Sequence, residues 1–181
     1  MLQDHAYRSN IYTQEECVAI CKAMEQNINV TLKDMPSQTS VKTSKVGMVE
    51  YGKVKDLLSK LKDLSLDANK HLFGFDLFQF TDLDVLLYNV YNVNEEYTWH
   101  IDASRGEVKD IKLTILLNVS TEPFEGGDLE LFFSAGSEQI VEFRKPGSFF
   151  VFPSWVPHRV TPVTSGTRRT ITLFLQGPLF K

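Results

Sequence analysis

The chain has 181 residues, 43% of them hydrophobic and 12% aromatic, and a formal net charge of −4 at pH 7. This composition predicts one packed globular domain, residues 1–181, and excludes an intrinsically disordered chain. No block of like charges is present, which argues against nucleic acid as a partner, and no apolar run is long enough to span a bilayer. We therefore expect an intracellular, cytoplasmic protein.

Residues 13–26 are predicted to form the first helix. Thr13 is a typical N-cap, and Glu16, three residues later, completes a capping box. Apolar residues follow at three- and four-residue spacing, as on one face of a helix. Cys17 and Cys21 lie one turn apart on that face. We expect both to be small buried residues, because two cysteines without further ligands make neither a disulfide framework nor a zinc site.

A loop, a strand and a second helix are predicted next. Residues 27–42 are polar and contain Pro36, which indicates a loop, and residues 41–51 are predicted to form an edge strand. From residue 54 to 72, a leucine-rich stripe at helical spacing lies opposite lysines and aspartates, which predicts a helix. Residues 1–72 are therefore expected to form a helical support region.

From Phe73 onward the pattern changes to short apolar runs, many with period two, separated by glycines and prolines. Strands of this length at spacings near ten residues are typical of a sandwich or barrel. We therefore predict a mainly β fold with flanking helices (α+β), in which residues 73–181 form the β core. The expected strands cover residues 75–80, 85–93, 97–102, 112–119, 129–133, 140–143, 148–152, 158–162 and 168–176.

A histidine and an aspartate two positions apart are the first candidate site residues. His100 and Asp102 fall in a predicted strand, where side chains two apart project from the same face. A second imidazole would complete a set of two histidines and one carboxylate, the facial triad of non-haem Fe(II) oxygenases. His158 is the candidate, because the two prolines in residues 153–157 fix where its strand begins.

An arginine in the predicted β core suggests an anionic ligand. Arg168 lies on the strand that folds back beside that of His158, and arginine is rarely buried unless it is paired. Its guanidinium fork matches a carboxylate, so a dicarboxylate that chelates the metal at one end would meet Arg168 at the other. Tyr91 and Tyr97 offer hydroxyl groups near the same pocket. Thr172 shares the face of Arg168 by period two, so its hydroxyl could join the arginine.

Structural roles compete with functional ones at several neighbouring positions. Tyr97 could line the pocket or merely pack. Trp99 alternates away from the metal ligands and is expected in the core, and Arg169 points away from the pocket for the same reason. Gly126 and Gly127 are expected to serve a tight turn that requires positive φ.

The order and spacing of these motifs resemble the 2-oxoglutarate- and Fe(II)-dependent dioxygenases, and within them the small, stand-alone, prolyl 4-hydroxylase-like proteins of bacteria and phages. A microbial or phage-encoded origin would fit this resemblance and the small size of the chain. The matching segments extend over most of the chain and comprise residues 68–69, 73–77, 91–92, 97–102, 113–118, 124–129, 146–148, 152–153, 158–163 and 166–168.

The resemblance implies a double-stranded β-helix, or jelly roll, with two N-terminal helices. It implies that His100, Asp102 and His158 bind Fe(II), and that Arg168, helped by Tyr91 and Thr172, holds the distal carboxylate of 2-oxoglutarate. The implied reaction consumes O2 and decarboxylates 2-oxoglutarate to succinate while a C–H bond is hydroxylated, with ascorbate as a helper in vitro. A prolyl residue of a peptide or protein is the implied substrate.

This sequence departs from the family pattern in one loop, and several alternatives stay open. Residues 92–96 lack the glycines common in relatives, which affects the shape of the substrate-facing loop. Residues 27–42 and 103–111 are candidates for a mobile lid. The rival functions are a nucleic-acid or small-molecule oxygenase of the same superfamily and a metal-binding jelly roll without turnover, because fold analogy does not transfer substrate. Either a monomer or a homodimer is compatible with the sequence.

Overall fold

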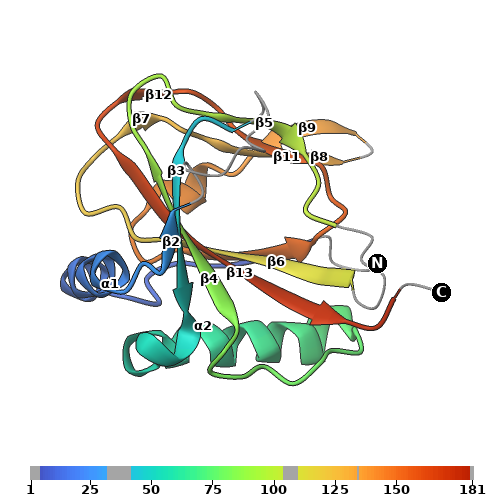
Figure 1. The fold of residues 1–181 in the computed structure, drawn as a ribbon. Coiled ribbons are helices and arrows are strands. Elements are labelled where there is room, and N and C mark those ends of the chain that lie inside the picture. The colour runs from blue at the N-terminus through green and yellow to red at the C-terminus, as the bar shows by residue number, and fades with distance from the viewer. Residues whose placement is uncertain (1–4, 32–41, 104–109, 134, 180–181) are drawn as a thin grey trace.

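The computed structural model describes residues 5–31, 42–103, 110–133 and 135–179. In this part of the chain, antiparallel strands form a jelly roll, and helices pack against the larger of its sheets (Figure 1). The predicted mainly β, α+β fold with two N-terminal helices is confirmed. The strands are β1 Ala6–Arg8, β2 Val30–Thr31, β3 Lys45–Glu50, β4 Val85–Tyr91, β5 Tyr97–His100, β6 Asp110–Asn118, β7 Glu125–Gly126, β8 Leu129–Phe133, β9 Gly136–Gln139, β10 Phe149–Pro153, β11 His158–Val160, β12 Val163–Ser165 and β13 Arg168–Gly177. The α-helices are α1 Gln14–Gln26 and α2 Lys55–Ala68.

The strands pair in two main sheets. The larger sheet has the order β1-β10-β6-β13-β4-β3-β2, the smaller one has the order β5-β11-β8-β9, and β12 pairs with β7. In the larger sheet, alternate side chains of β6 enter two different cores. Ile115 and Leu117 belong to the cluster that also contains the helices, whereas Leu116 packs with Leu129 and Leu131 of the smaller sheet. Burial on both faces explains why the apolar residues of β6 do not alternate with exposed polar ones.

The two predicted helices are confirmed. In α1 the backbone N–H of Glu16 donates to Thr13 Oγ1 and the N–H of Thr13 donates to Glu16 Oε2, so the capping box is complete. Cys17 and Cys21 are free and buried, as expected. Helix α2 continues through a π-helical turn, Asn69–Phe73, which ends at Gly74. No helix in the described ranges is long and apolar enough to cross a membrane.

The predicted strand at residues 75–80 is wrong, because no strand is assigned there. The backbone N–H of Phe75 donates to the side chain of Asn69, and that of Phe78 donates to the carbonyl of Gln176. Phe75, Leu77 and Phe80 pack against the helix-covered core. The alternation of apolar residues therefore reflects the packing of an irregular segment on that core. It does not reflect strand pairing within a sheet.

Two other predicted elements differ in type or position. Residues 140–143 were expected to be a strand, but Val141–Arg144 forms a 3-10 turn that buries Ile140 and Phe143 at the three-residue spacing of such a turn. The expected edge strand is β3, which is flanked by β4 on one side and by the short β2 on the other. Strand β2 lies inside the segment 27–42 that was predicted as a loop, and residues 32–41 of this segment are outside the described ranges.

Candidate metal centre

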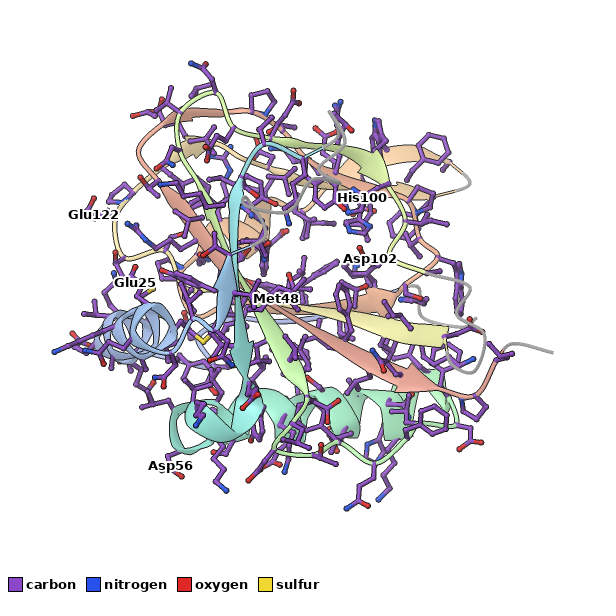
Figure 2. The ribbon with its side chains drawn as sticks, in the orientation of Figure 1. Glu25, Met48, Asp56, His100, Asp102 and Glu122 are labelled. Carbon is purple, nitrogen blue, oxygen red and sulfur yellow. The ribbon has the colours of Figure 1, made fainter. Side chains whose placement is uncertain are left out.

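Three potential metal ligands converge from neighbouring segments. His100 ends β5, Asp102 follows it, and His158 begins β11, which pairs antiparallel with β5 so that His158 lies opposite His100. One ligand atom from each of the three residues lies within 4.8 Å of the other two. Figure 2 shows His100 and Asp102 between the smaller and the larger sheet. The predicted ligands therefore meet in one place.

Strand geometry does not explain the position of Asp102. Strand β5 ends at His100, so the expected alternation along residues 97–102 is wrong for the last two residues. Instead, the backbone N–H of Asp102 donates to the carbonyl of Ser154 at 3.0 Å, and the hydroxyl of Thr114 donates to Asp102 Oδ2 at 2.8 Å. These two hydrogen bonds hold the carboxylate in the cavity.

Backbone carbonyls orient both imidazole rings. Nδ1 of His100 lies 2.7 Å from the carbonyl oxygen of Thr98, and Nδ1 of His158 lies 3.0 Å from that of Val156. Because a carbonyl oxygen can only accept, each neutral ring carries its proton on Nδ1 and its lone pair on Nε2. The Nε2 atoms lie 3.6 Å (His100) and 3.3 Å (His158) from the oxygens of Asp102. Such carbonyl contacts are typical of the groups that orient metal-bound histidines.

The protonation states also favour metal binding. Burial, with a smaller contribution from His158, lowers the pKa of His100 to about 4. Burial alone would raise the pKa of Asp102, but the close approach of the His158 and His100 rings and the hydrogen bond from Thr114 hold this pKa below its usual value. At neutral pH the site therefore offers a neutral His100 and an ionised carboxylate, the forms that metal ligation requires.

Arg168 lies in the same cavity, which has a volume of about 90 Å³. It begins β13, pairs with Tyr91 of β4, and is only 2% exposed. Burial lowers the pKa of its guanidinium group. The cavity is lined by Lys42, Leu87, Asn89, Tyr91, Tyr97, His100, Asp102, Leu116, Leu129, His158, Val160, Arg168, Thr170, Thr172 and Phe174.

The described residues provide little to balance the Arg168 charge. Its Nη1 donates to the hydroxyl of Thr170 at 3.4 Å, and its Cζ lies 5.1 Å from the ring centroid of Tyr91. Asp128 pairs with Arg144, and within the described ranges no carboxylate forms an ion pair with Arg168. A buried guanidinium group in this position fits an anionic ligand, because an unpaired buried charge is costly.

Three other predicted site residues, Tyr91, Tyr97 and Thr172, line the cavity, and only the contact of Thr172 differs from expectation. Tyr91 is buried beside Arg168. The Tyr97 ring stacks on His100, and burial raises the pKa of its hydroxyl to about 12. The predicted contact of Thr172 with Arg168 is wrong: its hydroxyl accepts from the Asn89 side chain at 3.0 Å, and Thr170 makes the contact with Arg168 instead. Both threonines share the face of Arg168, so period two alone did not distinguish them.

Residues that were not singled out in the sequence also belong to this region. Lys42 and Asn89 line the cavity, and Thr114 holds Asp102. Nothing in the sequence distinguishes a lysine after a polar loop, or an asparagine within an apolar strand, from a surface residue. Trp99 was expected in the core, but it is 39% exposed and lies under the guanidinium group of Arg159.

Comparison with known proteins identifies the family. Residues 86–176, half of the chain, match the family model of the 2OG-Fe(II) oxygenase superfamily. The matched stretch includes the four candidate residues His100, Asp102, His158 and Arg168. The chain belongs to this superfamily. Membership of this superfamily, together with the group of His100, Asp102 and His158, implies Fe(II) as the cofactor and 2-oxoglutarate as the cosubstrate of this protein.

Curated relatives of this superfamily member include PKHD-type hydroxylases. One from Synechococcus sp. (strain CC9605) is 38% identical over 86 residues, which are 46% of this chain and 37% of the relative. Another from Shewanella sp. (strain ANA-3) is 34% identical over 97 residues, 50% of this chain and 42% of the relative. The matched region thus spans about two fifths of the length of these relatives.

Solved structures with the same fold include prolyl hydroxylases. A prolyl-4-hydroxylase from Pseudomonas putida superposes with a TM-score of 0.74 at 19% identity, covering 97% of this chain and 94% of the other. A prolyl hydroxylase from Trichoplax adhaerens, solved with a peptide fragment of the hypoxia inducible factor oxygen degradation domain, has a TM-score of 0.74 at 18% identity, covering 95% and 83%. These similarities show that the superfamily member shares their fold.

Proposed function

We propose that this protein is a 2-oxoglutarate- and Fe(II)-dependent dioxygenase that hydroxylates a C–H bond of a prolyl residue in a peptide or protein and converts 2-oxoglutarate to succinate. The observation that carries the proposal is the combination, in one cavity, of two imidazole Nε2 atoms facing a carboxylate and a buried guanidinium group. A metal-binding module without turnover would have no need for that arginine.

In this proposal His100, Asp102 and His158 hold the metal. Their donor set of two imidazoles and one carboxylate leaves positions open for a cosubstrate. The bound iron would supply the activation of O2 that couples decarboxylation to hydroxylation. The chain contributes orientation: the carbonyls of Thr98 and Val156 keep both Nε2 lone pairs toward the metal position.

Arg168 would bind the distal carboxylate of 2-oxoglutarate. Thr170 steadies its guanidinium group, and Tyr91 covers it with an aromatic ring. Apolar residues Leu116, Leu129 and Phe174 line the same cavity and would exclude water from the bound cosubstrate. Tyr97 would keep its proton at neutral pH, so its hydroxyl could donate a hydrogen bond to the cosubstrate.

The prolyl assignment rests on similarity. Prolyl hydroxylases share the fold at 18–19% identity, and one of them was solved with a peptide fragment. The net charge of −4 gives no electrostatic drive toward nucleic acid. We further propose that ascorbate assists the reaction in vitro and that the protein is a monomer or a homodimer. Its proposed setting is the cytoplasm of a microbe, as a microbial or phage-encoded protein.

Succinate formation tests the proposal. Purified protein with Fe(II), ascorbate and 2-oxoglutarate should form succinate in the presence of O2, and a proline-containing peptide should raise the rate and gain 16 Da. His100→Ala should lower the rate at least about a hundredfold, because it removes a metal ligand. Arg168→Ala should raise the KM for 2-oxoglutarate by a similar factor, because a charge-assisted contact is lost.

His71→Ala is the matched control, since His71 is exposed on the π-helical turn after α2. It should leave the rate unchanged. Turnover that no peptide stimulates would reject the prolyl assignment and retain the dioxygenase. Absence of both turnover and iron binding in the wild-type protein would reject the enzyme.

A further inference from the structure

Lys42 brings a second positive charge into the cavity. Its backbone forms an isolated bridge with Tyr97, three residues before His100. Its Nζ donates to Asn89 Oδ1 at 2.7 Å and lies 4.6 Å from the ring centroid of Tyr97. The side chain is half-buried and lines the cavity together with the candidate metal ligands. This lysine therefore faces the interior of the site.

The surroundings of Lys42 hold the ammonium group without neutralising it. Asn89, its hydrogen-bond acceptor, is itself fixed because its Nδ2 donates to the hydroxyl of Thr172. The Tyr97 ring beneath the ammonium group is stacked on His100. In the described part of the chain no carboxylate forms an ion pair with Lys42. An ammonium group has three donors, and this arrangement leaves donors for a ligand.

The charges in the occupied site show what kind of ligand would fit beside Lys42. This count of charges rests on the function proposed above. An Fe(II) ion, Asp102 and Arg168 together carry two positive charges in excess, which the two carboxylates of 2-oxoglutarate would neutralise. Lys42 adds one positive charge that neither the described residues nor the cosubstrate balances. Lys42 is half-buried, and a charge that is withdrawn from water is unfavourable unless it is paired, so the remaining ligand, the substrate, is the group that can balance it.

We infer that Lys42 forms a subsite for a carboxylate of the substrate. The substrate then carries an acidic group close to the carbon that is hydroxylated, and a neutral prolyl segment binds less well. The carboxylate belongs either to a peptide, as an acidic side chain beside the target residue, or to a free acid such as an N-acylated amino acid. Both sources present the same chemistry to the ammonium group.

Calorimetric binding to the loaded but inactive protein tests this inference. The protein is loaded with Mn(II) and N-oxalylglycine, an inert analogue of 2-oxoglutarate, and is titrated with pairs of probes. The peptide pairs are acetylated and amidated tetrapeptides that carry Glu or Gln immediately before or after a central proline. The free-acid pair is N-acetylproline and N-acetylprolinamide. The pair with the larger preference identifies the source of the carboxylate.

We expect the wild-type protein to bind the acidic member of at least one pair about tenfold more tightly than the neutral member, as a charge-assisted hydrogen bond predicts. Lys42→Met should abolish this preference, and Lys42→Arg should retain much of it. Lys45→Met is the matched control, because Lys45 is an exposed lysine at the start of β3 and its removal changes the net charge equally. It should leave the preference intact.

Two results would overturn the inference while leaving the proposed function in place. One is equal binding, or no binding, of both members of every pair by wild-type protein that binds N-oxalylglycine. The other is a loss of N-oxalylglycine affinity in Lys42→Met as large as its change in probe preference, which would assign Lys42 to the cosubstrate. Failure of the wild-type protein to bind Mn(II) or N-oxalylglycine would instead overturn the proposed function and the inference with it. The midpoint of urea unfolding of Lys42→Met and Lys42→Arg shows that both variants are folded.

Discussion

Backbone carbonyls face the Nδ1 atoms of both histidines of the candidate metal centre and orient their rings. Each Nδ1 faces the carbonyl oxygen two residues earlier, at Thr98 or Val156, and this local contact needs no partner from elsewhere in the chain. The carboxylate, by contrast, depends on β6, because Thr114 donates to Asp102. The metal ligands are thus supported in two different ways, and each can be tested separately.

The Thr114 hydroxyl should contribute to metal affinity. Thr114→Val keeps the shape of the side chain but removes the 2.8 Å hydrogen bond to Asp102 Oδ2. We expect the Kd for Mn(II) or Fe(II) to rise by about tenfold to a hundredfold, as is typical for partners of ligating groups. Equilibrium titration of the metal-free protein measures it. Thr43→Val, at an exposed threonine, is the control, and an unchanged Kd in Thr114→Val would contradict this role.

The lowered pKa of His100 predicts a loss of stability in acid. Burial lowers this pKa to about 4, whereas an unfolded histidine titrates near 6.5. Between these values the unfolded chain binds a proton that the folded, metal-free protein does not bind, so stability rises with pH and is lost as pH falls through this range. The gap corresponds to about 3 kcal/mol. The lowered pKa of Asp102 acts in the same direction, but only below about pH 4.

Urea unfolding of the metal-free protein at several pH values between about 7 and 4 measures this effect. The wild-type protein should lose about 3 kcal/mol of unfolding free energy over the range. His100→Gln has no imidazole to titrate in this range. Its loss of unfolding free energy should therefore be smaller than that of the wild-type protein by about 3 kcal/mol. Parallel curves for the two proteins would show that another group dominates acid destabilisation.

Among the elements, the turn at β7 has an unexpected link to the site. Gly126 and Gly127 both have positive φ, as predicted for a tight turn. A methyl group added at Gly127 would lie 2.9 Å from Cδ of Arg168 and 2.9 Å from Cγ2 of Val163. The glycine therefore permits the close approach of the turn to the arginine, as well as the backbone conformation.

Gly127→Ala should weaken binding of 2-oxoglutarate. The added methyl group must displace the aliphatic part of Arg168, so we expect the Kd of N-oxalylglycine to rise by about tenfold, equivalent to about 1.4 kcal/mol. Calorimetry of the Mn(II)-loaded protein measures this change. Gly136→Ala is the matched control, since Gly136 also has positive φ but nothing lies within 4 Å of the added group. Equal affinities in the two variants would show that contact with Arg168 is unimportant.

At the scale of the whole molecule, the helices stabilise the sheet from the side opposite the candidate site. Helix α2 buries Leu58 and Leu61 in the cluster that includes Ile115, Leu117 and other residues of the larger sheet. The site residues Arg168 and Thr170 lie on the same sheet but line the cavity on its inner side. The fold thus separates stability from chemistry by using the two faces of one sheet.

Leu58→Ala should therefore destabilise the protein without changing its ligand affinity. Leu58 is fully buried, and its truncation should cost roughly 2–5 kcal/mol. Leu57→Ala, one position along the same helix and 38% exposed, should cost less than about 1 kcal/mol. Urea unfolding gives both values. A large change in N-oxalylglycine affinity in folded Leu58→Ala protein would contradict this separation.

The sequence by itself determined the features that depend on local contacts and periodicity. Residues close together in the chain determine the capping box at Thr13, the apolar stripes of α1 and α2 and the largely apolar character of β6. The metal ligands and Arg168 were recognised from the spacing of motifs. Local pattern failed at residues 75–80, because alternation there arises from packing on a distant core.

Only the tertiary structure decided which side chains meet. The pairing of β5 with β11 sets His158 opposite His100, and the carbonyl of Ser154 holds Asp102 where the strand has already ended. The hydroxyl that reaches Arg168 belongs to Thr170, and Lys42 enters the cavity from before β3. Periodicity assigns a residue to a face, whereas strand register and long-range hydrogen bonds select its partner, and these depend on residues far apart in the sequence.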